Sequence, residues 1–133
     1  TQVLYGAAFA ARRSAYCPYS RFAVGAAIRL LDGRVFTGAN VENASFGATI
    51  CAERSAIAAA VSSAGGRIAI VEVMVVTGTP EPTPPCGICR QVIAEFGHEC
   101  TVHAATTDGR IASWRLSELC PGAFGPSSHG FRL

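Results

Sequence analysis

The sequence contains no lysine and little charge of either sign. All eleven basic residues are arginines, 15% of the 133 residues are charged, and the formal net charge is +2. Because the arginines are scattered along the chain and not clustered, nothing indicates a surface for nucleic acid. Nucleic acid is therefore not expected as a partner.

Long apolar runs and a secretion signal are also missing. Arg, Asp or Glu interrupts each apolar stretch before it reaches the length that spans a membrane, so no membrane partner is expected. The first residues lack the basic, apolar and small-residue regions of a secretory signal. A cytoplasmic location is expected on these grounds.

The length and the apolar content limit the number of domains and the amount of apolar surface that the chain must bury. A chain of 133 residues is long enough for one buried core and too short for two, which predicts a single catalytic domain over 1–133. Half of the residues are hydrophobic, which is apolar for a small monomer. Two explanations stay open at this point: surface buried in an oligomer, or an alanine-rich core.

Six cysteines allow two interpretations. Three disulfides would suit a small secreted domain with a weak core, but this chain has a strong core and no secretion signal. Three of the cysteines stand in a metal-like motif. The other three, Cys17, Cys100 and Cys120, are expected to be buried apolar thiols.

Hydrophobic periodicity and turn residues predict alternating strands and helices. Helices are expected over 2–14, 51–63, 86–96 and 114–119, and strands over 22–31, 35–38, 68–77, 101–105 and 110–113. The β-branched run at 68–77 predicts a central strand buried on both faces. The order of elements predicts a three-layer α/β fold, a central mixed sheet flanked by helices.

Two short segments carry the chemistry, Cys51-Ala52-Glu53 and Pro85-Cys86-Gly87-Ile88-Cys89. A catalytic zinc takes three protein ligands and leaves a fourth position for water. A carboxylate two residues after one ligand is placed to exchange protons with that water. Two alternatives are a structural zinc site, which needs a fourth ligand that the motif lacks, and a glutamate that only stabilises a helix N-terminus. His98, His103 and His129 lie outside the motif and are not predicted as ligands.

These segments resemble the zinc-dependent cytidine deaminase family, in its class of small homotetrameric nucleoside deaminases. Residues 16–20, 22–27, 40–44 and 124–126 resemble further segments of that class, in the same order, so nearly the whole chain is covered. The resemblance implies a five-stranded sheet and one Zn²⁺ per chain, held by Cys51, Cys86 and Cys89. It implies hydrolytic deamination of cytidine and 2′-deoxycytidine to the uridines in pyrimidine salvage, with Glu53 moving the protons.

The resemblance also assigns residues to the substrate. Asn40 and Glu42 would bind the sugar hydroxyls, although both could instead be turn residues that satisfy their own backbone. Phe22 would stack on the base, although an inward strand phenylalanine is equally good core. Ala52 would also bind the substrate, and Ala44 and Cys51 would touch the base through their backbone groups. Phe124 would enter the site of a neighbouring subunit, so that a homotetramer shares its active sites.

Two arginines stand beside the cysteines. By the resemblance, Arg54 and Arg90 would hydrogen-bond the cysteine sulfurs, and the alternative is a solvated surface charge. A second enzyme function, deamination of a modified cytosine nucleoside such as blasticidin S, is also compatible with the zinc motif. Residues 40–43 and 124–126 favour the ordinary nucleoside.

Overall fold

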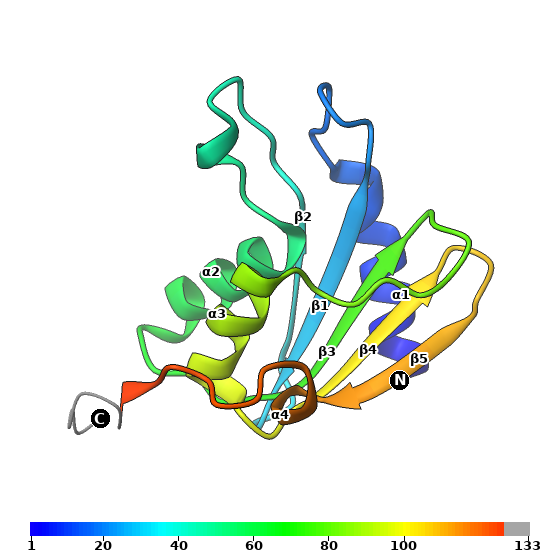
Figure 1. The fold of residues 1–133 in the computed structure, drawn as a ribbon. Helices are drawn as coiled ribbons and strands as arrows, with labels where there is room; N and C mark the ends of the chain where they lie inside the picture. The colour runs from blue at the N-terminus through cyan, green and yellow to red at the C-terminus, as the bar shows by residue number, and fades with distance from the viewer. Residues whose placement is uncertain (127–133) are drawn as a thin grey trace.

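A five-stranded sheet with helices on both faces forms the frame of the computed structural model (Figure 1). The structure describes residues 1–126. The elements are α1 (Gln2–Ala11), a 3-10 helix (Arg12–Ser14), β1 (Val24–Leu30), β2 (Val35–Ala39), a 3-10 helix (Phe46–Ala48), α2 (Ala52–Ala64), β3 (Ile70–Thr77), α3 (Gly87–Gly97), β4 (Thr101–Thr106), β5 (Ile111–Arg115) and α4 (Leu116–Leu119). The strand order is β2–β1–β3–β4–β5, with β3–β4 parallel and the other pairs antiparallel. This confirms the predicted α/β fold with a central mixed sheet.

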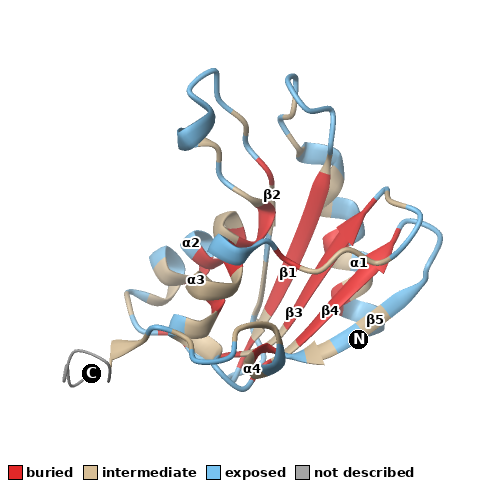
Figure 2. Ribbon diagram, in the orientation of Figure 1, coloured by how far each residue is buried: buried red, intermediate tan, exposed pale blue. Residues whose placement is uncertain are grey.

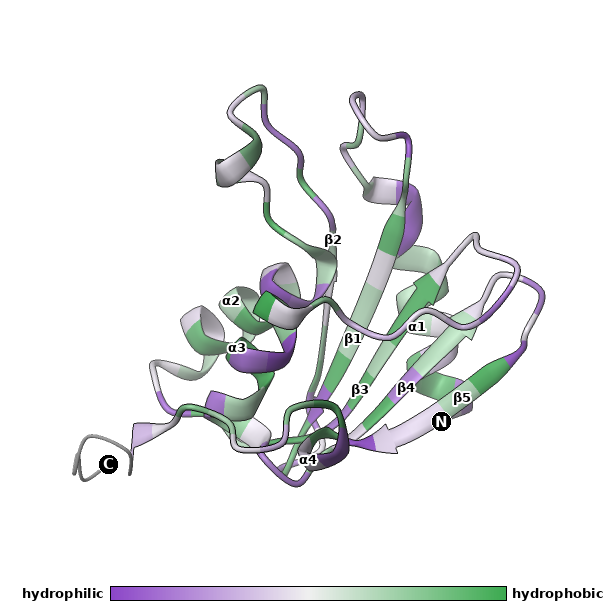
Figure 3. Ribbon diagram, in the orientation of Figure 1, coloured by the Kyte–Doolittle hydropathy of each residue, from purple (hydrophilic) through white to green (hydrophobic). Residues whose placement is uncertain are grey.

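Strand β3 lies at the centre of the sheet and is buried from both faces (Figure 2). Val73 and Val75 belong to the core formed with α2 and α3, whereas Met74 and Val76 pack against α1. Successive side chains of a strand point to opposite faces, so a strand covered on both sides needs an unbroken apolar run. The hydropathy colouring accordingly shows β1, β3 and β4 as largely hydrophobic (Figure 3).

Helix α2 approaches strand β2 so closely that the contact requires a glycine. A Cβ added at Gly38 would lie 2.5 Å from the backbone nitrogen of Ala56 and 2.6 Å from the backbone oxygen of Ala52. Both atoms belong to the backbone and cannot turn away. The absence of a side chain at Gly38 therefore sets the position of the first two turns of α2.

A row of polar side chains crosses four strands on the α1 face of the sheet. Arg29 Nε on β1 donates to Glu72 Oε1 on β3 at 3.1 Å, and His103 Nε2 on β4 lies 2.7 Å from Glu72 Oε2. His103 Nδ1 lies 2.7 Å from Ser113 Oγ on β5. These bonds satisfy His103, which is 8% exposed, and they tie the strands together beyond their backbone ladders.

Two predictions about local structure were wrong. Trp114 and Arg115 are not helical: they extend β5 and pair with Val102 and Thr101 of β4, so α4 begins only at Leu116. Strand pairing with β4 overrides the weak helical pattern of this short segment. Of the three cysteines expected to be buried, only Cys100 is; Cys17 and Cys120 are half-buried, because they lie in connecting segments at the surface.

The loops that precede β1 and follow β2 project beyond the sheet beside the start of α2 (Figure 1). They expose large apolar side chains, namely Tyr16, Tyr19, Phe22, Val41, Phe46 and Ile50. The rings of Tyr19 and Phe46 meet across the two loops, with their centroids 5.8 Å apart. Within residues 1–126, no helix combines the length and the apolar character that crossing a membrane requires.

Candidate active site

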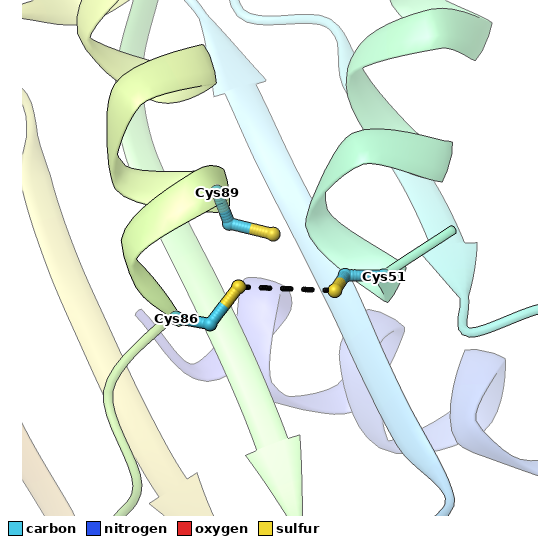
Figure 4. Close-up of side chains that lie close together, drawn as sticks. All are labelled: Cys51, Cys86 and Cys89. Carbon is cyan, nitrogen blue, oxygen red and sulfur yellow. Dashed lines mark hydrogen bonds between the residues drawn. The ribbon is translucent and has the colours of Figure 1, made fainter. Parts of the chain in front are cut away.

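Two helix N-termini bring three cysteine sulfurs together. Cys51 is the N-cap of α2, Cys86 is the N-cap of α3, and Cys89 lies in the first turn of α3. Figure 4 shows the three side chains pointing toward one another. The Sγ atoms of Cys51 and Cys86 are 3.9 Å apart, and all three sulfurs lie within 4.8 Å of one another.

This cluster fits a zinc ion. Zn–S bonds of about 2.3 Å in a tetrahedral site place the sulfurs roughly 3.8 Å apart, close to the spacing of Cys51 and Cys86. The positive ends of both helix dipoles favour thiolates at the two N-caps. Groups of three or more His, Cys, Asp or Glu side chains can hold a metal ion. Among residues 1–126, these three cysteines form the only such group.

The electrostatics of the cluster favour negative charge on Cys51. A hydrogen bond with Cys89 lowers the pKa of Cys51 to about 5, burial opposes this effect, and the hydrogen bond from Arg54 adds to it. The same bond with Cys51, followed by burial, raises the pKa of Cys89. The direction of both shifts therefore places the negative charge at Cys51 rather than at Cys89.

Arg54 lies against this thiolate. Its Nη2 is 3.6 Å from Cys51 Sγ and 3.2 Å from the carbonyl oxygen of Thr49. The hydrogen bond to Cys51 raises the pKa of Arg54, so the side chain remains a cation. Its Nε is buried and has no hydrogen-bond partner among residues 1–126.

Arg90 is placed differently from the expected sulfur contact. Its Nε donates to the carbonyl oxygen of Pro85 at 2.7 Å, and its Nη1 donates to that of Leu119 at 3.1 Å. Leu119 ends α4, where carbonyls have no helical partner and attract donors. Arg90 thus holds the backbone immediately before Cys86 instead of bonding to a sulfur.

Glu53 follows Cys51 by two residues and is 4% exposed. Burial raises the pKa of Glu53 to about 7; a hydrogen bond from its own backbone opposes this rise, and the negative charge of Cys51 adds to it. A carboxyl group in this state exchanges its proton near neutral pH.

A cavity of about 530 Å³ opens beside the sulfurs, with a size that suits a small organic molecule. Its wall contains the following predicted site residues: Phe22, Asn40, Glu42, Cys51, Ala52, Glu53, Cys86 and Arg90. Cys89 is buried behind the wall. Phe124 is not among the lining residues; its carbonyl oxygen accepts from Gln91 Nε2 on α3 at 2.6 Å.

The cavity wall also includes residues that the sequence did not indicate, among them Ser20, Thr77 and Thr83. Thr77 ends β3, and its hydroxyl lies 2.7 Å from that of Thr79, which lies 3.0 Å from that of Thr83. The loop between β3 and α3 is thereby held against the cavity. Ser20 had a signal in the sequence, since it belongs to residues 16–20, one of the segments that resemble the deaminase class.

The side chains of Asn40 and Glu42 form hydrogen bonds with the segment that leads into β1. Asn40 accepts from the backbone nitrogen of Val24 at 2.9 Å and donates to the carbonyl oxygen of Phe22 at 2.7 Å. Glu42 accepts from the backbone nitrogens of Tyr19 and Ser20. Neither side chain bonds to its own backbone, as a turn residue would.

Comparison with known proteins gives consistent matches. The model of the cytidine and deoxycytidylate deaminase zinc-binding region matches residues 1–105. The cytidine deaminase of Halalkalibacterium halodurans is 51% identical over 124 residues, 92% of each chain. That of Mycobacterium tuberculosis is 46% identical over 123 residues, 92% of this chain and 88% of its own. The crystal structure of cytidine deaminase from Burkholderia pseudomallei matches with a TM-score of 0.86 and 44% identity, over 92% of this chain and 98% of that one.

Proposed function

Because the chain belongs to the cytidine and deoxycytidylate deaminase family, we propose that it catalyses the hydrolytic deamination of cytidine and 2′-deoxycytidine. The products are uridine or 2′-deoxyuridine and ammonia, and the reaction serves pyrimidine salvage. The observation that carries the proposal is a buried glutamate, Glu53, in the same cavity as the sulfur cluster. A structural zinc site does not require a proton-transferring carboxyl group beside its ligands.

Cys51, Cys86 and Cys89 hold the zinc in this proposal. When bound, the ion acts as a Lewis acid that makes a water nucleophilic at neutral pH. Arg54 supports the ligands by its contact with Cys51, and the helix dipoles offset the charge of three thiolates. Arg90 contributes indirectly, by fixing the backbone at Pro85.

Glu53 moves the protons. It takes one from the attacking water and delivers it to N3 of the pyrimidine, which makes C4 electrophilic. The water oxygen then bonds to C4. Glu53 carries the remaining proton of that oxygen to the amino nitrogen, and the C4–N bond breaks to release ammonia. The pKa of about 7 that burial gives to Glu53 supports this role, because the group must both accept and release a proton in each turnover.

The other cavity residues recognise the nucleoside. Phe22 lines the cavity and stacks on the base, and Ala52, which also lines the cavity, contacts the substrate. Asn40 and Glu42 bind the sugar hydroxyls. They use the donor and acceptor positions that their hydrogen bonds to residues 19–24 leave open.

We further infer a homotetramer in which Phe124 enters the site of a neighbouring subunit. Its support is the exposure of large apolar side chains on three separate segments: Phe46 is 74% exposed, Ile88 is 62% exposed and Phe124 is 59% exposed. Surfaces of this kind are covered in symmetric oligomers. None of the six cysteines, all of which lie within residues 1–126, forms a disulfide, which supports a reducing, cytoplasmic compartment.

The test is turnover with a matched pair of cysteine variants. Conversion of cytidine is followed by ultraviolet absorbance, and ammonia and bound zinc are quantified. The parent and Cys120→Ser should form uridine and ammonia in equal amounts, whereas Cys86→Ser should lose both zinc and turnover. A zinc-loaded parent that deaminates neither cytidine nor 2′-deoxycytidine would refute the function.

A further inference from the structure

Three side chains from other parts of the chain hold the segment 19–24 that enters β1. Arg12 Nε donates to the carbonyl oxygen of Ala23 at 2.9 Å. Asn40 bridges Phe22 and Val24, and Glu42 accepts from Tyr19 and Ser20. The segment contributes Ser20, Phe22 and Val24 to the cavity wall, so these bonds shape the substrate side of the cavity.

Ser20 connects two of the residues proposed to bind the substrate, Glu42 and Phe22. Its hydroxyl donates to Glu42 Oε2 and accepts from the backbone nitrogen of Phe22 at 3.0 Å. Its own backbone nitrogen donates to Glu42 Oε1 at 3.1 Å. The hydroxyl of Ser20 is thus bonded both to the carboxylate and to the residue that carries the aromatic ring.

Glu42 retains capacity for a ligand after these contacts. An ionised carboxylate offers about four acceptor positions, and Tyr19 N, Ser20 N and Ser20 Oγ take three. The hydrogen bond from the Ser20 hydroxyl is also the largest cause that lowers the pKa of Glu42 below its ordinary value. Ser20 therefore orients the Glu42 carboxylate while leaving an acceptor position open.

The backbone next to Ser20 adopts a conformation that residues other than glycine rarely take. Arg21 has a φ of 58°, and its nitrogen donates to the carbonyl oxygen of Cys17 at 2.9 Å. A left-handed non-glycine residue persists where surrounding contacts determine the backbone. This turn directs Ser20 and Phe22, on either side of Arg21, into the same cavity.

We propose that Ser20 is a positioning residue for recognition of the nucleoside sugar: its hydroxyl sets the orientation of Glu42 and ties that carboxylate to Phe22. The proposal rests on the proposed deaminase function and adds a determinant of sugar specificity to it. Ser20 acts through Glu42, so its loss should weaken ligands that offer sugar hydroxyls more than ligands that lack them.

The probes are two competitive ligands that differ only in their sugar hydroxyls, uridine and 2′,3′-dideoxyuridine. Their Ki values are measured against cytidine turnover for the parent, Ser20→Ala, Ser20→Thr and the matched control Ser45→Ala. Ser45 lies in the neighbouring loop, is exposed, and makes no side-chain cap hydrogen bond. Zinc content and circular dichroism establish that each variant is folded.

In Ser20→Ala, the Ki of uridine should rise by about tenfold, the scale of one hydrogen bond to a charged group, and that of dideoxyuridine by much less. Ser20→Thr keeps the hydroxyl and should resemble the parent, as should Ser45→Ala. In a Glu42→Ala background, Ser20→Ala should change the ratio of the two Ki values no further. Ser20→Cys, with a weak donor, replaces Ser20→Ala if that variant does not fold.

An equal rise for both ligands, no rise for either, or the same change in Ser45→Ala would each overturn the positioning role. The outcomes also separate this inference from the function on which it rests. A parent that fails to deaminate cytidine refutes both. Deamination by the parent with an unchanged Ki ratio in Ser20→Ala refutes the role of Ser20 alone.

Discussion

The guanidinium of Arg54 bonds to the sulfur of Cys51 from one helical turn away, with Nη2 3.6 Å from Sγ. The pair links a cation directly to a proposed zinc ligand at the N-terminus of α2. The contact raises the pKa of Arg54. The pKa of Cys51 is lowered mainly by the hydrogen bond with Cys89, and the contact with Arg54 adds to this effect, so Arg54 and Cys51 each stabilise the charged form of the other.

Arg54→Ala should therefore weaken zinc binding by about 10- to 100-fold, the usual cost of losing a group that supports a ligand. Zinc affinity is measured by competition with a chromophoric chelator. Arg67→Ala is the matched control, since Arg67 is exposed and lies after α2, away from the cluster. Equal zinc affinity in the two variants would show that Arg54 does not support Cys51.

Gly38→Ala should destabilise the protein by about 2–3 kcal/mol, because the new methyl group meets backbone atoms of α2 that cannot rotate away. The measurement is the free energy of unfolding from urea titration. Gly6→Ala is the control: Gly6 lies in α1 with no atom within 4 Å of an added Cβ, and alanine there should stabilise by about 0.5–1 kcal/mol. Similar values for the two variants would contradict the close contact.

The sequence predicted well what depends on local pattern. The β-branched run predicted the buried strand β3, and the spacing of Cys86 and Cys89 placed both at the start of a helix. Interactions that depend on how the strands pair across the sheet could not be predicted from the sequence. The register of β3, β4 and β5 brings Glu72, His103 and Ser113 together, and no local pattern contains that information.

The site shows the same division. The motif indicated Cys51 and Glu53. Both lie at the start of α2 and line the cavity. The bonds of Arg90 to Pro85 and Leu119 could not be predicted, because they depend on where α4 ends relative to α3. Ser20 was missed for a similar reason, since its contact with Glu42 joins two loops.

Glu72 gives the fold a pH-dependent contribution to stability. Burial alone would raise the pKa of Glu72, but hydrogen bonds from His103 and Arg29 lower it below the ordinary value of 4.5. A lowered carboxyl pKa stabilises the fold above the unfolded value of 4.5, and this stability is lost as the pH falls through the folded pKa. The groups that face Glu72 are Arg29 on β1 and His103 on β4.

Glu72→Gln should accordingly lower the free energy of unfolding by about 1–2 kcal/mol at pH 7, with a difference that shrinks below pH 4.5. Urea titrations of parent and variant across pH provide the measurement. Glu95→Gln, an exposed position on α3, should change little at any pH. A Glu72→Gln effect that is constant with pH would contradict an ionic contribution.

Subunit mixing tests whether Phe124 completes a neighbouring site. Glu53→Gln and Phe124→Ala should each be poorly active alone, while hybrids should contain some sites with Glu53 from one chain and Phe124 from the other. The measurement is specific activity after the two variants are unfolded and refolded together, compared with each variant refolded separately. Activity no greater than the average of the separate preparations would contradict sharing of the sites.

The most direct measurement of the central claim is cytidine turnover by Glu53→Gln at matched zinc content, with Glu95→Gln as control. The account predicts that Glu53→Gln retains its zinc and loses turnover by about 10²- to 10⁴-fold, the scale of general acid–base catalysis, while the control matches the parent. Turnover by zinc-loaded Glu53→Gln at a rate near that of the parent would contradict the assignment of Glu53 as the proton carrier.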